Sequence, residues 1–229
     1  MTAPVPSRAA AWALLCEHTA SQPLRRHALA VEASMRALAL RAGVAEPAGL
    51  ETWGLVGLLH DFDYERFPTE QDHVFRGMEI LRARGWPEEI VKAVGGHAFY
   101  TGIARETPME KAIVAADELT GFVGACALVR PSRRIADVPV ESVVKRMKDK
   151  AFARSVDREY IRRGAEEVGL PLPELVALVL RAQVPIAARL GLDGAPAADL
   201  PDEPVPPEPP LDSAAVRAAA LGVSGPSGT

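Results

Sequence analysis

The sequence predicts an all-α fold, a bundle of about eight to ten helices. Alanine and leucine abound, while aromatic residues make up only 5% of the 229 residues, a composition that favours helix over sheet. Apolar residues recur at three- and four-residue spacing along segments that begin or end at proline or glycine. No stretch alternates apolar and polar residues between turn signals, as a half-buried strand would.

The first half of the chain predicts a series of helices bounded by capping or helix-breaking residues. Ser7 is a candidate N-cap of the first helix, and Pro23 and Gly43 bound the second. The segment 50–60 is apolar nearly all round, which indicates a buried helix. The expected ranges are 7–17, 23–43, 50–60, 72–85, 87–97 and 107–130.

The second half predicts further helices over 140–153, 158–169 and 173–191. Pro185 should kink or split the last of them. From Asp193 the composition turns to proline, alanine and acidic residues without large hydrophobic side chains, which is typical of disorder. We therefore expect a helical domain over 1–192 and a disordered Pro/Ala-rich tail over 193–229.

The overall composition bounds the class of protein and its partners. Hydrophobic residues make up 48%, charged residues 24%, and the net charge is −4, as in an ordinary soluble globular domain. Without a basic excess we expect no nucleic-acid polymer as partner. No apolar run is long enough to span a bilayer, and no secretory signal is evident, so we expect no membrane association. The sparse cysteines, Cys16 and Cys126, favour a reducing, cytoplasmic location.

Four of the five histidines fall on or beside separate predicted helices. One of them, His60, directly precedes Asp61, and Asp117 follows all four in the sequence. Histidine and carboxylate groups are ligands that suit Mn, Fe, Ni, Co, Zn or Mg. A buried, unpaired aspartate at the end of the apolar helix 50–60 would be costly, and a metal ion removes that cost. His18 lies outside the pattern. The candidate ligands of one or two divalent ions are His27, His60, Asp61, His73, His97 and Asp117.

This ordered set of ligands resembles that of the HD superfamily of metal-dependent phosphohydrolases. Over roughly residues 10–192, strings such as HDFDYERFP, AADELTGF and KDKAFARSVDRE are similar to a branch of predicted hydrolases in that superfamily. The resemblance implies the HD-domain helical bundle, with Asp61 bridging two metals where two are present and Asp117 closing the first metal's ligand set.

The number of metals depends on the histidines between the His-Asp pair and the final aspartate. Members with two further histidines there usually carry two ions. The string DHVFRGMEIL matches the family's His-x3-Gly-x3-Leu pattern with His73, Gly77 and Leu81. At the second position, however, Gly96 precedes His97 where many members have a second histidine. The sequence therefore leaves open whether the site binds one metal ion or two.

The resemblance implies a phosphomonoesterase or phosphodiesterase that acts on a small phosphorylated substrate by attack of metal-bound hydroxide. A nucleotide or cyclic nucleotide is the expected substrate class. Beside the ligand Asp61, the loop acids Asp63 and Glu65 are candidate catalytic residues, either as acceptors that orient ligands or as a general base.

Phosphate recognition needs cationic groups, and two basic clusters follow Asp117 in the sequence. The candidates for substrate binding within them are Arg130, Arg133 and Lys148. The alternative is that these clusters are solvated helix faces, as most charge runs are.

Two other functions stay open. Some HD proteins use the same ligand set in a mixed-valent di-iron oxygenase. A non-catalytic, metal-binding regulatory module is the other alternative, although degraded members of that kind commonly lose ligands, and this chain keeps the whole set. The sequence gives no indication of the oligomeric state.

Overall fold

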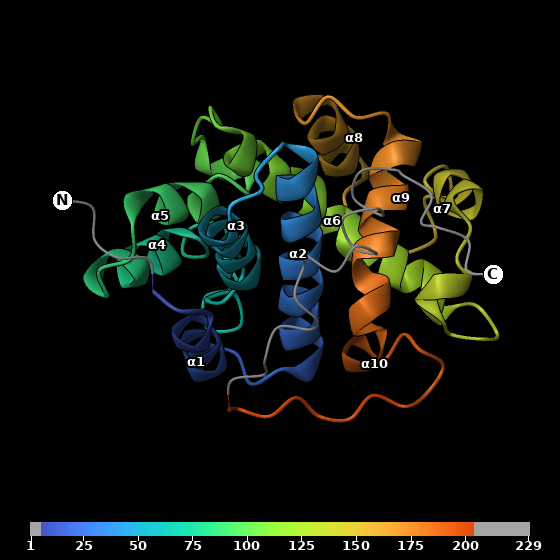
Figure 1. The fold of residues 1–229 in the computed structure, drawn as a ribbon, viewed down its shortest axis with the longest axis horizontal. Coiled ribbons are helices and arrows are strands. Elements are labelled where there is room, and N and C mark those ends of the chain that lie inside the picture. Colours follow the sequence, from blue (N-terminus) through green and yellow to red (C-terminus); the bar gives the residue numbers. More distant parts are fainter. Residues whose placement is uncertain (1–5, 204–229) are drawn as a thin grey trace.

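A computed structural model describes residues 6–203 of the chain. Within this range the chain forms helices and turns, with one isolated bridge between Arg134 and Asp193 and no strand (Figure 1), which confirms the predicted all-α fold. The α-helices are α1 (Arg8–His18), α2 (Gln22–Arg41), α3 (Pro47–Leu59), α4 (Phe75–Ala83), α5 (Glu88–Gly95), α6 (Pro108–Leu128), α7 (Val140–Arg146), α8 (Arg158–Glu167), α9 (Leu172–Gln183) and α10 (Ala187–Leu190). Short 3-10 helices lie at Phe99–Thr101, Ile135–Asp137 and Val184–Ile186.

Local signals explain most helix ends. α1 begins where the Ser7 hydroxyl accepts a hydrogen bond from the backbone N–H of Ala10. α6 begins at a capping box, in which Thr107 and Glu110 each bond the other's backbone N–H. Pro185 splits the last predicted helix into α9 and α10, joined by a 3-10 turn.

Two predicted helices are shorter in the structure. α4 begins at Phe75 rather than 72, because Val74 has φ 69° and ψ −49°, which an α-helix cannot contain. α7 ends at Arg146, and the expected continuation to 153 is a series of turns. There the Asp149 carboxylate accepts from the backbone N–H of Ala151 at 3.0 Å, an alternative that competes with helical hydrogen bonds.

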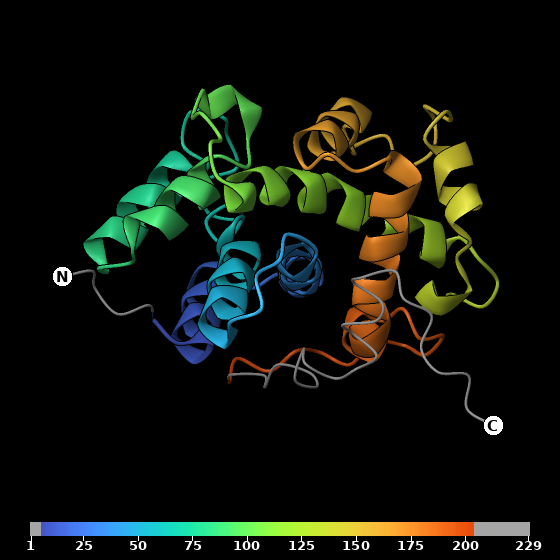
Figure 2. The same ribbon diagram turned by 45° about the horizontal axis from the view of Figure 1, so that its top comes forward.

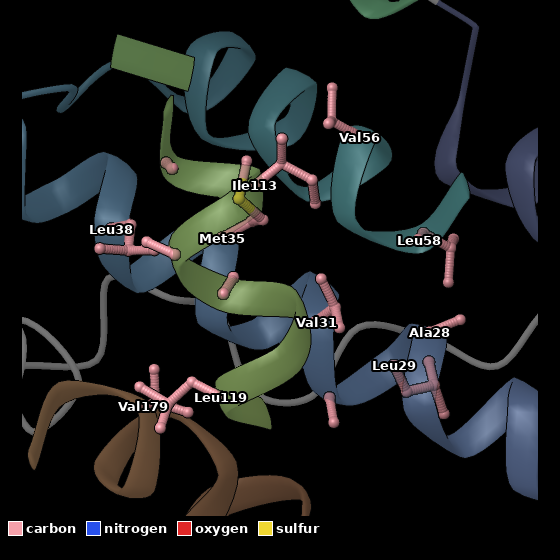
Figure 3. Packing of buried hydrophobic residues seen from close by; sticks show 14 of the residues in the cluster. Ala28, Leu29, Val31, Met35, Leu38, Val56, Leu58, Ile113, Leu119 and Val179 are labelled. Atoms are coloured by element: carbon pink, nitrogen blue, oxygen red, sulfur yellow. The ribbon is translucent and has the colours of Figure 1, made fainter. Parts of the chain in front are cut away.

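The helices pack around α2, which contacts α3, α6 and α9. In Figure 2, α6 runs across the molecule and α2 is seen nearly end-on beside it. Figure 3 shows the core between them, where Met35 of α2 faces Ile113 of α6, and Leu119 of α6 lies near Val179 of α9. The side chains of these four residues are completely buried.

Close contact between α3 and α2 places the end of α3 at the molecule's centre. A Cβ atom on Gly57 would lie 2.8 Å from the Val31 carbonyl oxygen of α2, so only glycine allows this approach. A buried ion cluster fixes the same helices: Glu32 of α2 accepts from Arg8 of α1 at 2.6 Å, and Arg36 of α2 donates to both Glu32 and Glu51.

The packed structure continues beyond the predicted domain boundary at residue 192. Residues 193–203 have no helix, as expected of this composition, but they run over α1 and α2. The Trp12 indole donates to the Pro201 carbonyl at 3.2 Å, Arg25 pairs with Asp202 at 2.6 Å, and Leu200 is buried. The rest of the tail predicted to be disordered, 204–229, lies outside the described residues.

No single helix among residues 6–203 is long and apolar enough to cross a membrane. Only α8 taken together with the segment Leu172–Leu190 meets the criteria of length and composition, across a bend of 98°.

Cys16 and Cys126 are both free thiols.

Candidate metal centre

The fold gathers all the predicted metal ligands at one place. His27 lies on α2, His60 caps α3, Asp61 follows it, His73 precedes α4, His97 follows α5, and Asp117 lies on α6. Their side chains form two groups, one of His27, His60, Asp61 and Asp117, the other of Asp61, His73 and His97. Within each group the candidate ligand atoms all lie within 4.8 Å of one another. Asp61 belongs to both groups.

In the first group, two imidazoles converge on one carboxylate oxygen. Nε2 of His27 lies 3.0 Å and Nε2 of His60 lies 3.3 Å from Oδ1 of Asp117. Nε2 of His60 also lies 3.4 Å from Oδ2 of Asp61. Helices α2, α3 and α6 therefore each supply part of one ligand group.

In the second group, the other oxygen of Asp61 is the focus. Oδ1 of Asp61 lies 3.1 Å from Nε2 of His73 and 3.2 Å from Nε2 of His97. The two oxygens of one carboxylate thus face two different sets of imidazoles. This is the arrangement that a ligand shared between two ions requires.

Backbone and carboxylate acceptors orient the imidazoles of both groups. Nδ1 of His60 lies 2.8 Å from the Gly57 carbonyl oxygen, and Nδ1 of His97 lies 2.7 Å from that of Val94. Because a carbonyl oxygen only accepts, Nδ1 carries the proton in each ring. In the neutral imidazole the lone pair then lies on Nε2, which is the atom that faces the aspartates.

The chemistry of this donor set fits divalent cations. Lone pairs on imidazole nitrogens and carboxylate oxygens repel one another unless a cation or a proton lies between them. Nε2 of His60 is fully buried and has no hydrogen-bond partner among the described residues. The carboxylate oxygens that face it, on Asp117 and Asp61, lie 3.3 and 3.4 Å away.

Without a cation, protons on the histidines relieve this repulsion. Burial opposes protonation of His60, but the adjacent Asp61 and Asp117 carboxylates outweigh it and hold the pKa of His60 well above its usual value. In the same way Asp61 and Asp63 overcome burial and raise the pKa of His73 to about 9. Burial also opposes ionisation of Asp61, yet the charge of His60 holds the pKa of Asp61 well below its usual range. A divalent ion would compensate the same carboxylates without buried imidazolium groups.

Asp63 is a positioning residue for His73. Its carboxylate is buried, with Oδ1 3.0 Å from Nδ1 of His73, while Oδ2 accepts from the backbone N–H groups of Val74 at 3.0 Å and Gly77 at 2.9 Å. These bonds hold Val74 at its positive φ, and a Cβ on Gly77 would lie 2.9 Å from the carboxylate. Because both oxygens are engaged, the structure supports the orienting role predicted for Asp63 and not the general base.

Glu65, the other loop acid, bonds the backbone before α2. Its exposed carboxylate accepts from the backbone N–H of Ser21 at 2.9 Å and so ties the loop to the start of α2. The prediction of a catalytic role for Glu65 finds no support in this contact.

Glu118 is a residue at the centre to which the sequence assigned no role. Burial, and then repulsion from the adjacent Asp117, raises its pKa to about 7. Its carboxylate accepts from the backbone N–H of Asp157 at 3.2 Å, which links α6 to the start of α8. The sequence signal was its place next to Asp117, but its burial depends on α8, which is distant in the chain.

The predicted phosphate-binding residues are not brought to the ligands as a group. Arg130 follows Asp117 by thirteen residues along α6 and its end, which at about 1.5 Å per residue separates them by roughly 20 Å along the axis. Lys148 is exposed in the turn after α7, a helix that also packs near the far end of α6 (Figure 1). Neither contacts a metal ligand. Only Arg133 lines a cavity that also reaches one ligand, His27.

Comparison with known proteins agrees with this geometry. A family model described as the HD domain matches residues 24–121, the range that contains every candidate ligand. No curated protein and no solved structure matched the chain. Residues 24–121 therefore form an HD domain.

Proposed function

We propose that the protein is a metal-dependent phosphohydrolase that cleaves a phosphate ester of a small molecule. The observation that carries the proposal is that the two carboxylate oxygens of Asp61 face different imidazoles. Oδ1 faces His73 and His97, and Oδ2 faces His60. Divalent ions held by these residues would supply Lewis-acid chemistry, lowering the pKa of a water and withdrawing charge from phosphoryl oxygens. HD domains are typically metal-dependent hydrolases, which supports this reaction class over other uses of the same ligands.

The ligand side chains are exposed to solvent on one side of the centre and buried on the other. The side chain of His60 is completely buried, and those of His73 and His97 nearly so. In contrast, 24% of the Asp61 side chain, 23% of His27 and 17% of Asp117 remain exposed. A substrate therefore approaches across Asp61, Asp117 and His27, while the buried imidazoles hold the far side and exclude water from it.

Phosphate release from a panel of esters tests the proposal. The purified protein, loaded in turn with Mn²⁺, Co²⁺, Ni²⁺ or Fe²⁺, is expected to hydrolyse p-nitrophenyl phosphate or its bis ester and to lose this activity with EDTA. Asp61→Asn should lose bound metal and hydrolysis together, because it alters the ligand of both groups. The matched control is Asp137→Asn, an exposed aspartate outside the ligand groups.

Two results would overturn the proposal. One is an iron-loaded protein that consumes dioxygen without releasing phosphate, as an oxygenase would. The other is a protein with bound metal that hydrolyses no ester of a panel including nucleotides and cyclic nucleotides, as a regulatory module would. The nucleotide class expected from the sequence stays a prediction until this panel is measured.

A further inference from the structure

A cavity of about 650 Å³ lies between α2 and α6, and its wall includes the metal ligand His27. We name it the α2–α6 cavity. Its volume is within the usual range for sites that bind small molecules. On the α6 side it is lined by Gly121, Gly124 and Leu128, which follow Asp117 by four, seven and eleven residues and so share its helix face. The cavity thus extends from the ligand group along α6.

Glycines keep this space open. A Cβ atom on Gly121 would meet no atom within 4 Å, and one on Gly124 would meet only Leu192 Cδ1, at 3.9 Å. Neither glycine has a positive φ, so the backbone does not require glycine at these positions. Since glycine weakens a helix interior, the pair costs stability without any packing need among the described residues. What they preserve is room beside the metal centre.

A buried amide in the wall has no partner. Gln183, at the end of α9, is 1% exposed and lines the cavity, and its Nε2 makes no hydrogen bond to any described residue. A buried N–H donor without an acceptor is costly, so a bound molecule that brings an acceptor such as a carbonyl oxygen would remove that cost. This amide points to a ligand independently of the glycines.

The rest of the lining indicates what kind of molecule fits. The other α2–α6 cavity residues are mainly small or aliphatic, with Arg26 and Arg133 as its cations. No phenylalanine, tyrosine or tryptophan lines it, so apart from the imidazole of the metal ligand His27 it offers no aromatic ring on which a nucleobase could stack. An ester that reaches the metal ligands past His27 would place its substituent among aliphatic groups.

We propose that the α2–α6 cavity holds the non-reacting part of the substrate, and that this part is an aliphatic chain with a carbonyl-type acceptor rather than a nucleobase. The inference rests on the proposed function, whose substrate class it narrows. The phosphoryl end lies toward His27 and Asp117, the chain lies along Gly121 and Gly124, and the acceptor reaches Gln183. From Gly121 to Leu128 the helix rises by roughly 10 Å, room for several methylene groups.

Binding of non-hydrolysable phosphonates tests the position of the chain. Isothermal titration of the metal-loaded, full-length protein would compare methylphosphonate with octylphosphonate. Each methylene that is buried lowers the Kd about fourfold, so burial of only three is expected to lower it roughly fiftyfold. Gly124→Leu, and separately Gly121→Leu, should reduce this ratio to below about threefold because the new side chain fills the space. Both substitutions favour helix. Ala9→Leu, at an exposed site on α1, is the control that keeps the ratio.

A second measurement tests Gln183 without any metal. N-octylacetamide carries the chain and the acceptor but no phosphate, and it is expected to bind the EDTA-treated protein. Gln183→Met keeps the approximate volume but removes the amide, and should weaken this binding roughly two- to tenfold through the loss of one hydrogen bond. Equal affinity of the wild type and Gln183→Met for N-octylacetamide would overturn the role of this amide.

The outcomes separate this inference from the proposed function. Equal Kd values for methyl- and octylphosphonate, or adenosine monophosphate binding more tightly than octylphosphonate and unaffected by Gly124→Leu, would overturn the inference. If methyl and octyl phosphate are hydrolysed with equal KM, the proposed function is upheld and this inference is overturned. If octylphosphonate binds as expected but octyl phosphate is never cleaved, the proposed function fails while the cavity remains a binding site for the chain.

Discussion

Replacing Asp63 with asparagine is expected to remove His73 as a metal ligand while the helical fold is retained. In the wild type, Nδ1 of His73 donates to Oδ1 of Asp63, so Nε2 is free to face Asp61. The other oxygen of Asp63 accepts from the backbone N–H groups of Val74 and Gly77. Asparagine has only one acceptor oxygen, so it cannot satisfy both sides of this arrangement.

The surroundings of Asp63 determine which donors lose their acceptor in Asp63→Asn, either His73 or the backbone N–H groups of Val74 and Gly77. If the amide oxygen turned toward His73, two buried backbone N–H groups would be left unsatisfied, at about 1–3 kcal/mol each. If it stays on Val74 and Gly77, the amide nitrogen faces Nδ1 of His73, and the imidazole must move its proton to Nε2. Loss of an orienting partner typically costs 10–100-fold in metal affinity, about 1.4–2.7 kcal/mol. The second alternative costs less, so the histidine changes its tautomer.

Metal stoichiometry measures this effect. At a free metal concentration that gives two ions per chain in the wild type, Asp63→Asn should retain about one, and the second should require roughly 10–100-fold more metal. Circular dichroism should show the same helix content. Glu65→Gln is the control, because that acid bonds Ser21 on the far side of the loop. Two ions bound at unchanged affinity by Asp63→Asn would refute the assignment of His73 and the role of Asp63.

Two further predictions concern the metal-free protein. Chelation should lower the melting temperature in calorimetry, since metal at 100 times its Kd stabilises the fold by about 2.7 kcal/mol; an unchanged melting temperature would contradict a bound metal. In EDTA-treated protein, Glu118→Gln should raise the melting temperature above pH 7 and leave it nearly unchanged at pH 4. The pKa of Glu118 is raised from 4.5 to about 7 on folding, so its carboxylate opposes folding above pH 7, whereas below 4.5 both states are protonated. If Glu118→Gln raised the melting temperature at pH 4 and not above pH 7, the raised pKa of Glu118 would be contradicted.

The sequence predicted most helices, and it predicted which histidines and aspartates the fold brings together, because both depend on local or chemically specific signals. Spacing and capping residues define α1, α2 and α6, and histidine and aspartate are restricted in what they coordinate. The start of α4 was missed because a side chain eleven residues earlier, that of Asp63, holds Val74 out of the helix. No local pattern encodes such a contact.

The substrate residues were harder to predict, because nearness in sequence was taken for nearness in space. Arg130 and Lys148 follow the ligand Asp117, yet the straight run of α6 carries the chain away from the centre. The α2–α6 cavity joins residues of α2, α6 and α9 with the loop 191–197, and only the paired glycines on one face of α6 marked it in the sequence.

The position of Gly96 bears on the number of metals. The resemblance of the sequence to the HD pattern left one ion or two open, because Gly96 stands where that pattern commonly has a second histidine. A Cβ at this position would point toward Arg105 Cγ and the Lys92 carbonyl oxygen, each at 3.3 Å, and not toward Asp61. The Gly96 carbonyl instead accepts from Arg105, whose guanidinium also pairs with Glu167 of α8 at 2.7 Å.

A side chain at residue 96 would therefore lie between α5 and the segment that contacts α8, outside the second ligand group. That group keeps its three donors, Asp61, His73 and His97, whatever residue 96 is. Asp61 gives one oxygen to each group, so a single ion in the first group would leave the imidazoles of the second facing Oδ1 without a cation. Burial lowers the pKa of His73, but the Asp61 and Asp63 carboxylates raise it to about 9, so without that cation a buried proton holds the imidazole beside Oδ1. A second ion would replace this proton, and Gly96 does not oppose it.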